Sequence, residues 1–186
     1  MGTKIEILRT KDGSRVILKV PKTCQRVGDE AVAKIEKELA ADPSLSFLGG
    51  FSCSSAPDSE DMAGVVVAVH QTMTPPSPSE FKRACGLPLK QRLAWVRKKF
   101  GESGKLEIEA APCDAANERI TLLGNGRTEG VDFARMTLLP SAKGVVLVNV
   151  MYRADGSQSV RAAFDAIADS TSVRLPPSSP ASPAER

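Results

Sequence analysis

His70 is the only histidine of the chain, so a hydrolase built on Ser-His-Asp or Cys-His would have to use it. Such a hydrolase needs the imidazole beside its nucleophile and a carboxylate that orients the ring. Cys53 and Cys85 are the candidate nucleophiles, and Asp58 or Asp61 is the candidate orienting carboxylate. A single histidine at the end of an apolar strand is more often a boundary residue with a satisfied hydrogen bond. We therefore predict no catalytic residues and keep a hydrolase using His70 as an alternative.

Metal and cofactor sites are not predicted either. Asp58, Glu60 and Asp61 form an acidic cluster, but they lack the alternating spacing and the final glutamate of a calcium-binding loop. We interpret them as hydrated loop charges. The glycines of GNGRTEG (124–130) lie between two strand-like segments, whereas a dinucleotide site needs a glycine loop between a strand and a helix. This segment predicts a turn.

Two surfaces are candidates for binding a protein partner. The helix predicted at 90–99 carries a basic face, which suits an acidic partner or anionic lipid headgroups but is also an ordinary solvated face. The loop 71–79 contains prolines that order its backbone and so reduce the entropy lost on binding. The candidate partner-binding residues are Gln71, Thr72, Met73, Thr74, Asp58, Glu60, Asp61, Arg97 and Lys98.

The four cysteines, Cys24, Cys53, Cys85 and Cys113, are dispersed along the chain. None forms a C-x-x-C pair, which disfavours zinc and thioredoxin-like sites. An even number of dispersed cysteines favours two disulfides in an oxidising compartment, with three pairings open. The alternative is four free thiols in the cytosol.

Composition excludes several classes of function. A net charge of +3 without a dominant basic stripe and an aromatic content of 4% disfavour nucleic-acid binding. No apolar run is long enough to span a bilayer. The opening MGTKIEILRT lacks the apolar core of a signal peptide, so any leader or lipobox is expected upstream of residue 1. A membrane is expected to be a partner only through such a lipid anchor.

Hydrophobic periodicity predicts strands and helices in mixed order. Asp12-Gly13 predicts a hairpin turn, Asp29 is a candidate helix cap, and Ser77 with Glu80 predicts a capping box. The expected strands are 4–10, 15–20, 45–53 with a bulge at its glycines, 64–72, 105–111, 118–123, 131–139 and 144–153. The expected helices run from 29 to before Pro43, from 77 to a break at 86–88, from there to Phe100, and from 157 or 159 onward.

The strands at 64–72 and 144–152 are apolar on both faces, so we expect them in the middle of the sheet. In the helix that ends at Phe100, the apolar stripe consists of Leu89, Leu93, Val96 and Phe100, with Trp95 off the stripe. Residues 1–175 are expected to form a single domain, and the Pro/Ser-rich segment 176–186 a disordered tail.

The two ends of the chain resemble the PsbP/Mog-like α/β/α sandwich, which includes DcrB-type periplasmic lipoproteins. The resemblance rests on the strand Gly144–Tyr152, the helix pattern Phe164-x-x-Ile167-x-x-Ser170 and the opening strand RVILKVPK (15–22). It implies a non-enzymatic protein-binding scaffold outside the cytoplasm, similar to small bacterial immunity proteins.

Together these patterns predict an α+β fold, in which a mainly antiparallel twisted sheet is flanked by helices and the C-terminal helix closes one face. The predicted function is non-enzymatic protein binding in the bacterial cell envelope, in the periplasm or elsewhere outside the cytoplasm. An immunity protein that occludes a secreted toxin is the specific hypothesis, and a DcrB-like envelope lipoprotein or assembly factor is the alternative. No cofactor and no nucleic acid are expected.

Overall fold

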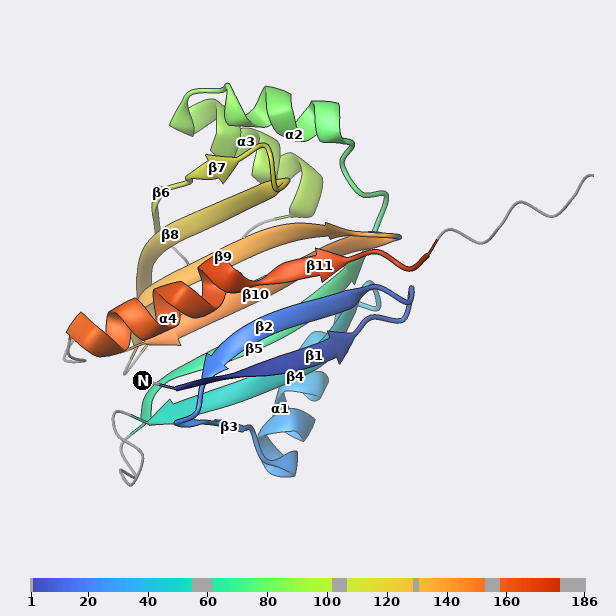
Figure 1. The fold of residues 1–186 in the computed structure, drawn as a ribbon. Coiled ribbons are helices and arrows are strands. Elements are labelled where there is room, and N and C mark those ends of the chain that lie inside the picture. The colour runs from blue at the N-terminus through green and yellow to red at the C-terminus, as the bar shows by residue number, and fades with distance from the viewer. Residues whose placement is uncertain (1, 55–61, 102–106, 129–130, 153–157, 178–186) are drawn as a thin grey trace, which may run out of the picture.

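The computed structural model describes residues 2–54, 62–101, 107–128, 131–152 and 158–177. A large antiparallel sheet forms the middle layer, in the strand order β3-β4-β5-β10-β9-β8-β6, with β7 paired to β8 (Figure 1). These strands are β3 (Cys24–Arg26), β4 (Leu45–Ser54), β5 (Met62–Thr72), β6 (Glu107–Ala110), β7 (Cys113–Asp114), β8 (Arg119–Thr128), β9 (Val131–Ser141) and β10 (Gly144–Tyr152).

The two strands expected in the middle of the sheet, β5 and β10, pair there with each other. Side chains of a strand alternate between the two faces, and both faces of β10 are covered. Val146 and Val148 belong to the core on one face, and Val145 to the core on the other. Burial of each valine stabilises the fold by about 1.5 kcal/mol or more.

One face of this sheet is covered by a smaller sheet and by the C-terminal helix. The small sheet has the order β1-β2-β11 and consists of β1 (Thr3–Arg9), β2 (Arg15–Pro21) and β11 (Ser172–Arg174). Helix α4 (Gln158–Ser170) packs beside it, with Phe164 and Ile167 in the same core as Leu18 of β2. The predicted α+β fold and its closing helix are therefore confirmed.

The opposite face is covered by α2 (Pro78–Cys85) and α3 (Leu89–Phe100). Ser77 and Glu80 form the expected capping box at the start of α2. The stripe predicted for α3 is wrong at one end, because Leu89 is 41% exposed. Trp95 takes part in the packing instead, with its ring edge-on to Phe81 and Phe100. Its size lets it reach a neighbour from the edge of the stripe.

Helix α1 (Asp29–Leu39) lies against β4 and buries none of its residues. Its N-cap is Gly28, so the prediction that Asp29 caps the helix is wrong. Asp29 lies instead in the first turn, where its negative charge interacts favourably with the positive end of the helix dipole. The bulge expected in β4 is confirmed, since the β4–β5 register shifts between Phe47 and Gly49.

Both predicted disulfides are present, and they resolve the open pairing. Cys24 is bonded to Cys53, its partner in the β3–β4 ladder, and Cys85 at the end of α2 is bonded to Cys113 of β7. The bridged residues are 29 and 28 positions apart. In the chain-entropy description, closing loops of this length stabilises the fold by about 3–4 kcal/mol each.

Three short strands, β3, β7 and β11, were not expected from the sequence. The turn predicted at 124–130 is wrong in its first residues, and its last two lie outside the described residues. Gly124 and Asn125 continue β8, paired with Ala134 and Phe133 of β9. The ladder becomes irregular only between Asn125 and Thr128. Pairing with β9 therefore outweighs the weak strand preference of glycine. Within the described ranges, no helix is long and apolar enough to cross a membrane.

Candidate functional site: a buried polar network beside a proline-lined groove

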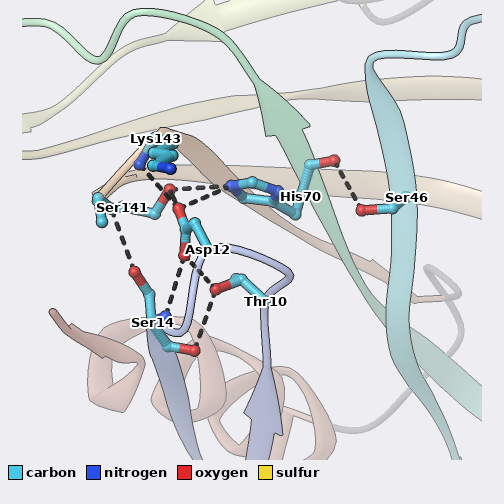
Figure 2. A network of polar contacts seen from close by, with 8 residues as sticks. Thr10, Asp12, Ser14, Ser46, His70, Ser141 and Lys143 are labelled. Atoms are coloured by element: carbon cyan, nitrogen blue, oxygen red, sulfur yellow. Dashed lines mark hydrogen bonds and ion pairs between the residues drawn. The ribbon is translucent and has the colours of Figure 1, made fainter. Parts of the chain in front are cut away.

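A buried polar network joins two turns that are far apart in the sequence (Figure 2). The first is the β1–β2 turn, where Gly13 has a φ of 86° that favours glycine. In this turn, the hydroxyl of Thr10 and the backbone N–H of Ser14 donate to Asp12 Oδ1, the latter over 2.9 Å. The Asp-Gly pair thus closes the hairpin and fixes the position of a carboxylate.

The second turn lies between β9 and β10. There, Asp12 Oδ2 accepts from Ser141 Oγ at 2.9 Å and from the backbone N–H of Lys143 at 2.8 Å. His70, at the end of β5, places Nε2 2.9 Å from Ser141 Oγ and 3.4 Å from Asp12 Oδ2. The side chains of His70 and Asp12 are 2% and 3% exposed. A hydroxyl, an imidazole and a carboxylate therefore converge, but inside the protein.

The absence of a side chain at Gly144, at the start of β10, leaves space for the ring of His70. A Cβ on Gly144 would lie 2.8 Å from His70 Nε2 and 2.1 Å from the carbonyl oxygen of Gln71. Only glycine fits at that position, because both distances are shorter than van der Waals contact. The glycine that follows Lys143 is thus needed for the approach of the histidine ring to the turn.

The connectivity of the cluster differs from that of a nucleophilic triad. In a triad, the serine hydroxyl donates to one ring nitrogen and the other ring nitrogen donates to the carboxylate. Here Ser141 donates to Asp12, and Ser141 and Asp12 lie at the same ring nitrogen of His70. Because the Ser141 hydroxyl proton is committed to Asp12, we assign the ring proton to Nε2, which donates to Ser141 Oγ. Nδ1 is buried and has no hydrogen-bond partner among the described residues.

The carboxylate of Asp12 is held in its charged form. Burial alone would raise its pKa, but hydrogen bonds from Thr10, from Ser14 and from the backbone of Lys143 outweigh this effect. Together they hold the pKa of Asp12 well below its ordinary value of 3.8. Such a carboxylate is a weak base, so it orders the serine hydroxyl without activating it.

Beside this network lies a groove with a volume of about 450 Å³. The segment before α2, the β7–β8 turn, the β9–β10 turn and the end of β11 contribute its walls. The groove is lined by Pro75, Pro76, Pro78, Asn117, Glu118, Leu139, Pro140, Ser141, Ala142, Val173 and Leu175. Ser141 belongs to both features, since it lines the groove and its hydroxyl belongs to the network.

The groove is mainly apolar, with a few polar groups at the β7–β8 turn. Glu118 has a φ of 48°, the only positive φ among the described non-glycine residues. A left-handed backbone at such a residue costs on the order of 1 kcal/mol, which the tight β7–β8 turn offsets here. Asp114 stabilises the same turn by accepting from the backbone of Ala116 and Asn117. Glu118 is thus the one acidic residue in the lining of a mainly apolar groove.

The predicted partner-binding residues are distributed over separate regions. Thr72 and Thr74 are exposed, and Gln71 is partly buried, in the segment that leads from β5 to the groove. Met73 packs against the core under α2 and α3. Arg97 and Lys98 are exposed on α3, and neither lines the groove. Asp58, Glu60 and Asp61 lie outside the described residues.

The candidate catalytic partners of His70 also lie elsewhere than expected. Cys53 and Cys85 are both in disulfides, so neither is a free thiol. The residues that do contact His70, Asp12 and Ser141, were not selected from the sequence. Asp12 was interpreted only as a turn residue, and Ser141 is 71 positions from the histidine. No spacing signal links them, because strand pairing alone brings them together. Among the described residues, no group of three side chains is arranged to bind a metal ion.

No family model matches the chain, and no curated protein matches its sequence. The chain is similar to solved structures, among them LpqN, described as involved in cell envelope biogenesis of Mycobacterium tuberculosis. It is 15% identical and has a TM-score of 0.46, over 93% of this chain and 92% of that chain. A similarity of this extent carries no functional argument, and the resemblance to the PsbP/Mog-like sandwich stays a prediction.

Proposed function

We propose that this protein is a non-enzymatic domain that binds an extended segment of a protein partner in the proline-lined groove. The observation that carries the proposal is the groove itself, a preformed apolar recess of about 450 Å³. Recesses of this size that are mainly apolar and contain a few polar groups are typical binding sites. Apolar side chains of the partner would fill it, and a lysine or arginine would pair with Glu118.

The rigidity of the groove supports binding. Pro75, Pro76 and Pro140 have fixed φ angles and form much of its wall. The capping box of Ser77 fixes the start of α2 at one side. Because the walls are already ordered, little conformational entropy is lost when a partner binds.

The polar network supports the same proposal through its connectivity. Asp12 holds the turn that carries Ser141 and Lys143, and so fixes the wall of the groove on that side. Ser141 Oγ is already committed to a carboxylate, and the cluster is buried. Its role in the proposal is to position the wall of the groove.

The disulfides support a location outside the cytoplasm. All four cysteines are paired, and such bonds persist in oxidising compartments but are rare in the cytosol. Protein recovered from its native compartment should contain no thiol that can be alkylated, as measured by mass spectrometry without reduction. Recovery of four alkylated cysteines would contradict this part of the proposal.

The narrower hypotheses differ in what happens to the partner. An immunity protein would block the catalysis of a secreted toxin, whereas a DcrB-like assembly factor would bind an envelope protein without inhibiting an enzyme. Both remain predictions. They can be separated by measuring the activity of the bound partner with and without an excess of this protein.

The groove can be tested with a substitution that fills it. Random peptides displayed on phage would be selected on the full chain, and the affinity of the selected peptides measured by fluorescence anisotropy. We expect sequences in which apolar residues flank a lysine or arginine. Ala142→Trp should lower their affinity about tenfold or more, because the indole occupies the space of a partner side chain. Arg97→Ala is the control, because Arg97 is exposed on α3 away from the groove.

Two results would contradict the proposal. The first is peptide binding that Ala142→Trp leaves unchanged while the variant keeps its disulfides and its melting temperature. The second is esterase or peptidase turnover that Ser141→Ala abolishes in a folded protein. That result would establish the alternative of a hydrolase using His70, which is favoured only by the convergence of Asp12, His70 and Ser141.

A further inference from the structure

The outer face of the small sheet is exposed and combines isoleucines with basic side chains. On β1, alternate residues point away from the core, and among them Ile5 is 64% exposed and Ile7 50% exposed. Ile7 pairs with Ile17 of β2, which is only partly buried. Three isoleucines therefore form an apolar strip across two neighbouring strands. Figure 1 shows these strands in the outermost layer of the fold.

Basic residues surround this strip on the same face. The register places Lys19 opposite Ile5, Arg9 opposite Arg15, and Arg174 of β11 opposite Arg15. All four basic residues are exposed. The other described positions of this face, Thr3, Pro21 and Ser172, are uncharged, so these strand positions include no carboxylate. In β1 the one acidic residue, Glu6, points to the opposite side and pairs with Lys4 and Arg26.

We propose that this face docks onto an anionic lipid surface, with the isoleucines entering the interface and the four basic residues at the headgroups. The combination of an apolar strip with lysine and arginine is the pattern of elements that lie on membranes. A basic residue near an anionic bilayer is attracted by its surface potential. This docking is independent of the groove, since none of the residues of the face lines it.

A membrane fits this face better than an acidic protein or a second copy of the chain. The face has no tyrosine or tryptophan, and none of its isoleucines or basic residues lines the groove, whereas the anchors of protein interfaces are often aromatic side chains held in pockets. Two copies placed face to face would bring basic side chains together, which disfavours self-association. A uniformly anionic surface needs no directional recognition.

The test is co-sedimentation of the full chain with vesicles. Vesicles of phosphatidylglycerol and phosphatidylcholine should bind the protein, and vesicles of phosphatidylcholine alone should bind it far less. Arg15→Gln with Lys19→Gln should reduce the partition coefficient about thirtyfold, which corresponds to two headgroup contacts. Ile5→Ser with Ile7→Ser should also weaken binding and leave its dependence on salt in place. Because Arg15 and Lys19 are exposed, the charge variant should keep the melting temperature of the parent protein.

The matched control is Lys34→Gln with Lys37→Gln, which removes the same charge from exposed positions of α1. If this control weakens vesicle binding as much as the variant of the small sheet does, the proposal is wrong. It is also wrong if anionic vesicles bind no protein, or if polyglutamate binds the face and vesicles do not. Ala142→Trp should leave vesicle binding unchanged, and Arg15→Gln with Lys19→Gln should leave peptide binding unchanged. Failure of the groove and failure of the membrane face are thereby distinguished.

Discussion

Asp12 and Arg92 each hold a turn in place through several hydrogen bonds to one charged side chain. They lie on opposite faces of the large sheet and have opposite charges. Among the described residues, Asp12 accepts from four donors, which belong to Thr10, Ser14, Ser141 and Lys143. Arg92 of α3 donates to four backbone carbonyls, which belong to Ala84, Cys85, Leu87 and Ala111. Each charge is stabilised mainly by neutral dipoles, and each fixes a turn against its neighbours.

Asp12 and Arg92 differ in the sequence separation of the segments that they join and in their exposure to solvent. Asp12 joins segments 129 and 131 residues apart and is 3% exposed. Arg92 joins segments that are 5 to 19 residues apart and is only partly buried. The Cys85–Cys113 disulfide also fixes the end of α2 beside Arg92. Asp12 therefore holds two layers together, whereas Arg92 strengthens a corner that is already crosslinked.

The largest effect is expected for Asp12→Ala. It should lower the free energy of unfolding by about 3 kcal/mol, because it leaves several buried donors without their acceptor. Urea unfolding at neutral pH measures this. Asp42→Ala is the matched control, since Asp42 accepts from the backbone and hydroxyl of Ser44 in an exposed turn. The comparison fails if the two variants lose equal stability.

A smaller loss is expected for Arg92→Ala, about 2 kcal/mol, because water can reach part of the site and replace some of the lost donors. Amide exchange should accelerate in α2 and leave β5 and β10 unaffected. Arg92→Lys should recover only part of the loss, since an ammonium group cannot reproduce the planar fork of a guanidinium. If Arg92→Ala proves more destabilising than Asp12→Ala, the ranking of the two regions is reversed.

The smallest expected effect is the pH dependence of the stability that Asp12 contributes. The folded-state pKa of Asp12 is lowered, so its contribution to stability is complete above the unfolded-state pKa of about 4 and declines as the pH falls below it. The stability difference between the parent protein and Asp12→Ala should therefore be constant above about pH 5 and shrink toward pH 2. For Arg92→Ala it should stay nearly constant, because guanidinium groups keep their charge throughout this range. Urea midpoints measured at a series of pH values test this. Parallel pH curves for the parent protein and Asp12→Ala would contradict the prediction.

Local patterns predicted most of the secondary structure. The Asp12-Gly13 turn, the capping box of Ser77 and Glu80 and the break before α3 depend on hydrogen bonds between residues close in sequence. The short strands β3, β7 and β11 were missed, since three residues or fewer carry no periodicity. Each of them forms because a longer neighbouring strand has backbone N–H and C=O groups free for hydrogen bonding at its edge.

The amino-acid sequence by itself determined the apolar strands β5 and β10, the closing helix with Phe164 and Ile167, and the presence of cysteines that could pair. Only the tertiary structure decided which cysteines pair, which segments line the groove and which residues meet His70. The physical reason is that periodicity and turn preferences act over a few residues, whereas Asp12, His70 and Ser141 meet through strand pairing across most of the chain. The same pairing placed three isoleucines and four basic residues on one open face.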